Sequence, residues 1–172
     1  MVHQNSILKL NTIKELYNLQ KHYLLKLLEN IPNEELFHGQ ENGVSSPGWV
    51  LGHLVVELED IINHLNLNVQ PLPEYWLESF KGGNNWNNRP LKKLPSKYSL
   101  IKIFENRYDV LMNEYLRLDD KVREESHPSK MFSEVYSNID SWFAHHLITH
   151  LAIHSGNITA WKQNKGMKVN GF

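Results

Sequence analysis

The most constraining feature of the chain is residues 141–161, a stretch that contains no Asp, Glu, Lys or Arg. A helix without charge on any face is buried on most of its sides. The stretch holds four of the ten histidines, three of them in the pattern His146-x-x-x-His150-x-x-x-His154. Residues four apart lie on one face of an α-helix. The stretch therefore predicts a buried helix carrying a row of imidazole rings, at the centre of a helical bundle or at a subunit interface.

The composition excludes several classes of protein. The formal net charge of −1 argues against a nucleic-acid-binding surface, and 172 residues predict one domain over the whole chain. With no cysteine present, disulfides, thiolate nucleophiles and cysteine metal sites are excluded. Residues 1–20 lack the apolar segment of a secretory signal, and the polar side chains of 141–161 argue against a membrane span. We therefore expect a cytoplasmic protein without nucleic-acid or membrane partners.

Apolar residues at helical spacing predict four long helices. Their ranges are about 12–30, 46–66, 96–118 and 139–163. The first range opens on Thr12-x-x-Glu15, which fits a capping box. The second opens on Ser46 and Pro47, a typical N-cap followed by proline at the first helical position.

Residues 69–97 form a long connection rich in Pro, Gly and Asn, with a short extra helix expected at 74–80. A link of this length crosses a bundle from end to end or folds over a site. The predicted fold is an all-α four-helix bundle with a long crossover connection between helices 2 and 3.

His150 and His154 are the first candidates for metal ligands, because two imidazoles one helical turn apart can bind one ion. Alternatively, both rings hydrogen-bond within the core, and the spacing alone leaves both interpretations open. Buried imidazoles need partners, since an unpaired buried polar group costs about 1–3 kcal/mol. His53 is by itself typical of a core residue. Combined with the other two, it would complete a three-ligand site with one open position, as in catalytic zinc centres.

Two further residues are candidates for catalysis. Glu57 follows His53 by one turn and would orient a ligand or act as a base, unless it belongs to a solvated acidic patch. His146 precedes His150 by one turn, and we expect it to line a pocket rather than to be a fourth ligand. His145 is expected elsewhere on the helix, at the surface or at an interface. Three tryptophans are either core residues or walls of a pocket: Trp49, Trp76 and Trp86.

Several segments resemble the DinB-like family, metal-binding four-helix bundles that include bacillithiol transferases and hydrolases of the YfiT type. They are Ser46–Leu54 before and within the second helix, Leu94–Ser96 with Ile103–Arg107 in the third, and His146–Asn157 with Trp161–Gly166 in the last. By position, the resemblance implies His53, His150 and His154 as ligands of one divalent ion, zinc or nickel. The chain departs from the family at Asn157, where Gln is usual, and at Trp161–Lys162, where an arginine is common. The groups beside the metal are therefore expected to differ.

The resemblance also implies a small-molecule substrate and a homodimer. Our leading hypothesis is a thiol-dependent S-transferase, in which the ion holds a low-molecular-weight thiol as thiolate. One alternative is a metal-dependent hydrolase that activates water. Another is a non-catalytic, metal-stabilised binding or stress-response module.

Overall fold

A computed structural model of the chain describes residues 2–38, 44–82, 94–128 and 134–169, with side-chain burial from residue 9 onward. Within these ranges the secondary structure is helical and contains no strand, so the predicted all-α class is confirmed. The helices are α1 (Val2–Leu28), α2 (Pro47–Val56), α3 (Glu59–His64), α4 (Glu74–Phe80), α5 (Lys97–Arg117), α6 (Asp120–Glu124), α7 (Ile139–Ala144) and α8 (His150–Asn164). A π-helical turn, η3 (His145–Thr149), joins α7 to α8.

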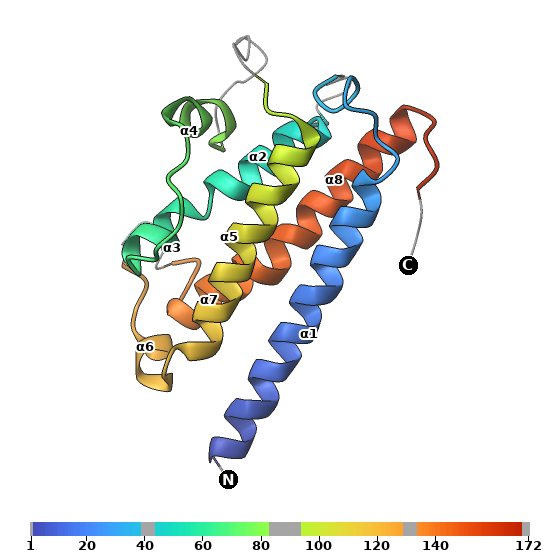
Figure 1. Cartoon of the computed structure of the whole chain (residues 1–172). Helices are drawn as coiled ribbons and strands as arrows, with labels where there is room; N and C mark the ends of the chain where they lie inside the picture. Colours follow the sequence, from blue (N-terminus) through green and yellow to red (C-terminus); the bar gives the residue numbers. More distant parts are fainter. Residues whose placement is uncertain (1, 39–43, 83–93, 129–133, 170–172) are drawn as a thin grey trace.

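Four of these helices enclose the core. Helix α1 packs against α5 and α8, and α2 packs against the same two neighbours. In Figure 1, α1 and α8 run in one direction while α2 and α5 run in the other. The connection between α3 and α5 therefore returns along the bundle, as the crossover prediction required. It includes α4, which packs on α2.

The helix starts agree only in part with the sequence predictions. The Ser46 hydroxyl accepts a hydrogen bond from the Trp49 N–H (3.4 Å), so the N-cap predicted there is present. The Ser96 hydroxyl accepts one from the Ser99 N–H (3.2 Å) and caps α5 at the start of its predicted range. The predicted start at Thr12 is wrong, because α1 already begins at Val2. Residues 2–11 contain neither proline nor glycine, and nothing in them interrupts a helix.

The second predicted helix is divided. Helix α2 ends at Val56 and α3 begins at Glu59, so Glu57 caps the first of two segments. The pair ends near the predicted boundary, where Asn66 has a positive φ of 51°, a conformation common at helix C-termini. The division places the Glu57 side chain at a helix end beside His53, where it accepts the backbone N–H of Gly82 (3.2 Å).

Two lysines tie neighbouring helices to the C-terminal end of α1. The Lys162 ammonium donates to the Leu27 carbonyl (2.9 Å), and the Lys97 ammonium donates to the carbonyls of Glu29 (3.1 Å) and Ile31 (2.8 Å). A helix C-terminus carries unpaired carbonyls and a partial negative charge, so cations are favourable there. Burial lowers the pKa of both amines. These contacts fix α5 and α8 against α1.

Not all of the uncharged stretch 141–161 is buried. Leu147, Leu151 and Ile158 lie in the core, whereas Ile153 is 53% exposed. The exposed side of α8 also carries small uncharged residues, Ala152 and Gly156. A homodimer that covers this side remains a prediction. None of the described helices is both long and apolar enough to span a lipid bilayer.

Helices α2 and α4 approach each other closely at Gly52. A Cβ atom on Gly52 would lie 2.5 Å from the ring of Phe80, which is fully buried. A ring held in a packed core cannot move away without strain. Because the Phe80 carbonyl contacts His53 (3.0 Å), this close approach also sets the position of a candidate ligand.

We expect Gly52→Ala to lower the free energy of unfolding by about 1–3 kcal/mol through overpacking. The matched control is Gly156→Ala, where a Cβ meets nothing within 4 Å. Alanine is the better helix former by about 1 kcal/mol, so the control is expected to stabilise the protein. Urea unfolding of both variants measures the difference. Equal stability of the two variants would contradict the close packing of α2 on α4.

Candidate metal centre

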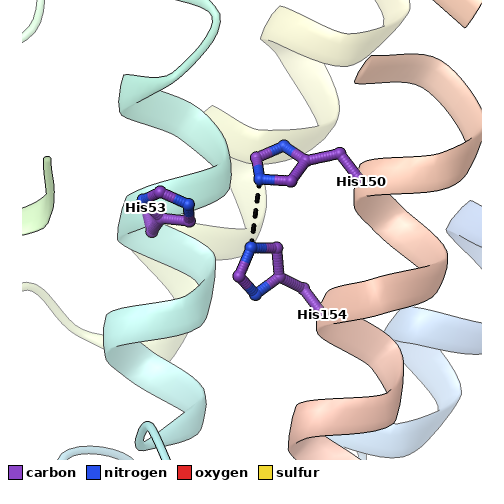
Figure 2. A group of neighbouring side chains, drawn as sticks. All are labelled: His53, His150 and His154. Atoms are coloured by element: carbon purple, nitrogen blue, oxygen red, sulfur yellow. Dashed lines mark hydrogen bonds between the residues drawn. The ribbon is translucent and has the colours of Figure 1, made fainter. Parts of the chain in front are cut away.

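The three predicted ligands meet between two helices. His53 projects from α2, and His150 and His154 project from α8 into the same space, as Figure 2 shows. One ligand nitrogen from each ring lies within 4.8 Å of the other two, and the Nε2 atoms of His150 and His154 are 3.0 Å apart. All three residues are at most 9% exposed. The fold therefore brings the predicted triad together in a nearly dry site.

The donor set fits a borderline divalent ion. Nitrogen ligands lie about 2.0–2.1 Å from zinc, so two of them on one ion are separated by roughly 3 Å. The spacing of the His150 and His154 nitrogens agrees with this value. Imidazole suits zinc and nickel, and the chain offers no thiolate that would compete. The histidine triad can therefore hold one such ion.

Neighbouring groups orient the His53 ring. Its Nδ1 lies 3.0 Å from the Phe80 carbonyl oxygen, which can only accept, so Nδ1 carries the hydrogen and Nε2 keeps its lone pair. The Trp49 indole stacks on the ring with 4.8 Å between centroids and 7° between planes. Metal-binding histidines characteristically donate their second N–H in this way, which fixes the tautomer and the ring orientation.

Asn157 lies beside the other end of the triad. Its side-chain amide nitrogen is 3.2 Å from His154 Nδ1, so in this orientation Nδ1 accepts and Nε2 donates toward His150. Rotation of the amide presents its oxygen instead, which makes Nδ1 the donor and frees Nε2 for an ion. Asn157 therefore takes the place that Gln was expected to hold, with a shorter side chain.

Burial keeps these rings neutral. Desolvation, reinforced by neighbouring imidazoles, lowers the pKa of His150 to about 2, of His154 to about 4 and of His146 to about 3. A neutral imidazole retains the lone pair that an ion requires. The rings are therefore available for binding well below neutral pH.

Glu57 lies next to the triad. Its Oε1 is 3.6 Å from His53 Nδ1 and 3.2 Å from the N–H of Gly82. Gly82 itself approaches closely, since a Cβ there would lie 3.1 Å from His53 Cε1. Glu57 thus contacts a candidate ligand. That Glu57 acts as a base remains a prediction.

A cavity of about 650 Å³ adjoins the triad at His150, and Glu57 is also among its lining residues. The rest of its lining is Asp60, Asn63, His64, His127, Pro128, Tyr136, Trp142, His145 and His146. His146 lines the cavity as expected. Neither Trp49 nor Trp76 lines it: the first stacks on His53 and the second packs on Phe80. Trp86 lies outside the described residues.

The prediction that His145 points away from the site is wrong. In a regular α-helix, residues five apart are rotated by about 140° from each other. The π turn η3 closes i→i+5 hydrogen bonds, and the rings of His145 and His150 stack with 5.3 Å between centroids. The histidine spacing gave no sign of this turn, nor of the cavity residues His64 and His127, which come from other segments.

Comparison with known proteins identifies one family. A model of the DinB superfamily matches residues 16–158, a range that includes all three candidate ligands. No curated protein and no solved structure gives a significant match to the chain.

We expect His53→Ala and His154→Ala each to weaken zinc binding at the triad, because each removes a direct ligand. The zinc affinity should fall by more than the roughly 10- to 100-fold that is lost when an outer hydrogen-bond partner of a ligand is removed. Titration of chelator-treated protein, with helicity checked by circular dichroism, measures the effect. His22→Ala, an exposed histidine on α1, is the control and should bind as the parent does. Full affinity in the His53→Ala, His154→Ala double variant would exclude the triad.

The metal-free protein should lose stability as the pH falls from 7 to 5.5. Unfolded histidines with a pKa near 6.5 take up protons that the buried rings of His146, His150 and His154 cannot bind. For each ring, the free energy of unfolding should fall by about 1 kcal/mol over this interval. Urea unfolding in the presence of a chelator measures the decline, which His146→Asn should make shallower and His22→Ala should leave unchanged. A free energy of unfolding that is flat over this interval would show that the rings are not buried as described.

Proposed function

The chain belongs to the DinB superfamily, and from that premise we propose that it is a metal-dependent enzyme that transfers a low-molecular-weight thiol to an electrophilic small molecule. One observation carries the proposal. His150, one of the three buried imidazoles, lines a cavity that Glu57 also lines. A metal site that adjoins a cavity suits a reaction at the ion better than a purely structural role.

His53, His150 and His154 would hold one zinc or nickel ion. Such an ion lowers the pKa of a thiol that binds to it, so that the thiol reacts as thiolate near neutral pH. The chain has no cysteine and so no sulfur nucleophile of its own. A small thiol from solution would supply that missing group.

In this proposal Glu57 accepts the proton of the thiol. Its carboxylate lines the cavity and has one oxygen 3.6 Å from the ring of His53. In the proposed step the thiol proton passes to Glu57, the sulfur forms a bond to an electrophilic carbon, and the leaving group departs with the bonding electron pair. The contact with the Gly82 N–H holds the carboxylate in position.

His146 and the aromatic residues of the cavity would position the substrate. His146 is 7% exposed, and burial lowers its pKa to about 3, so it offers a neutral hydrogen-bonding ring rather than a charge. Trp142 and Tyr136 contribute aromatic surface to the same cavity. These groups favour a compact, partly apolar electrophile.

The test is a conjugation assay of zinc- or nickel-loaded protein with a panel of small thiols and a chromogenic aryl halide. We expect metal-dependent conjugation, with Glu57→Gln lowering kcat by roughly 10²- to 10⁴-fold while the metal stays bound. Asp60→Asn is the matched control, since Asp60 lines the same cavity and shows no contact with the triad. It should change kcat far less than Glu57→Gln.

The other hypotheses give different results in the same experiment. Cleavage of activated esters without any thiol would indicate the hydrolase. Absence of turnover with every thiol and ester, together with a melting temperature that falls when the metal is removed, would indicate a metal-stabilised binding module. Either result contradicts the transferase.

A further inference from the structure

A second cluster of imidazoles lies in the cavity, beyond the triad. His145, His146 and His150 each place a ring nitrogen within 4.8 Å of the other two. The ring centroids are 5.2–5.5 Å apart. The cluster shares His150 with the triad and occupies the inner wall of the cavity.

Two nitrogens of this cluster lack partners. The Nδ1 atoms of His146 and His150 are buried and make no hydrogen bond to any described residue. These residues are 7% and 9% exposed. An unpaired buried polar atom costs about 1–3 kcal/mol, so native structures rarely keep one without a ligand, an ion or a water beside it. Two such atoms in one cluster of potential ligands are groups that a bound ion would satisfy.

The charges around the cluster favour a cation. The cavity carries the carboxylates of Glu57 and Asp60, and no lysine or arginine is among its described lining residues. A cavity lined by one sign of charge concentrates ions of the opposite sign.

The π turn is not needed for the i,i+4 spacing within the triad but is needed for this cluster. His150 and His154 both belong to α8 and have the spacing of a regular α-helix. The turn instead brings His145, which a regular helix would place about 140° away, onto the ring of His150. Single π turns inside α-helices are rare and are frequent at functional sites. The position of His145 is therefore a reason for the chain to keep this turn.

We propose that His145, His146 and His150 form a second divalent-cation site, and that His150 is shared between the two ions. Since Nε2 of His150 faces His154 (3.0 Å), its Nδ1 is the nitrogen left for the second ion. When both nitrogens bind, the Nδ1–H bond breaks, the proton leaves to solvent, and the imidazolate bridges two ions. The glutamate and aspartate of the cavity offset the added positive charge. This inference concerns the number of ions bound and stands whether or not the proposed transfer reaction is found.

Equilibrium dialysis of the metal-free full chain against zinc tests the proposal. We expect two zinc ions per chain, one in the His145→Asn, His146→Asn double variant, and one in the His53→Ala, His154→Ala double variant. His64→Asn is the matched control, because His64 lines the same cavity and belongs to neither cluster, and it should bind two. The two double variants make failure of the triad and failure of the second site separately visible.

Two results would overturn the second site. The first is that the parent chain binds only one zinc ion. This measurement needs no variant, so it does not depend on whether the variants fold. The other is a second ion that remains in the His145→Asn, His146→Asn variant, which would place it elsewhere.

Copper loading tests the shared ligand. A bridging imidazolate couples the two Cu(II) spins, so the electron paramagnetic resonance signal should integrate to clearly less than two spins when two ions are bound. The His145→Asn, His146→Asn variant with one copper should give one full spin. Two fully independent spins in the parent chain would overturn the sharing of His150.

Discussion

The packing of α2 against α8 brings imidazole rings into a space from which most water is excluded. Both elements contribute apolar neighbours: every residue of α2 is buried, and Leu151 and Ile158 of α8 lie in the core. Desolvation there lowers the pKa of His150 and His154, which keeps both rings neutral. The neutral imidazole nitrogens satisfy only part of one another's hydrogen-bonding capacity. A bound ion would satisfy the rest. The suitability of this site for a metal ion thus follows from how the core is assembled.

A short series of contacts connects the fold to the chemistry. Gly52 admits the Phe80 ring, the Phe80 carbonyl fixes the hydrogen on Nδ1 of His53, and the opposite nitrogen faces the triad. Glu57 closes the same end of α2 and reaches both His53 and the cavity. Lys162 ties α8, and Lys97 ties α5, to the C-terminal end of α1. Small changes in helix packing are therefore expected to alter ligand geometry before they alter the fold.

The π turn lets the last helical segment contribute to two groups of histidines. Past the turn, His150 and His154 keep the regular spacing that a single ion needs. Within it, His145 and His146 join His150 on the cavity side. His150 is a member of both groups, so this one residue connects the cavity to the triad. A substrate or an ion in the cavity would act directly on a ligand of the triad.

The sequence alone determined the all-α class and the N-cap at Ser46, because helical periodicity and capping are local properties of the chain. The i,i+4 spacing indicated His150 and His154, whereas His53 was predicted from the family resemblance, and the fold brings the three rings together. It did not reveal the break at Glu57 or the π turn, which depend on packing between helices. The early start of α1 was also missed, although nothing in residues 2–11 interrupts a helix. The cavity also required the tertiary structure. His64, His127 and Tyr136 have no regular spacing relative to the triad, and only the folding of their separate segments onto α7 and η3 places them around one space.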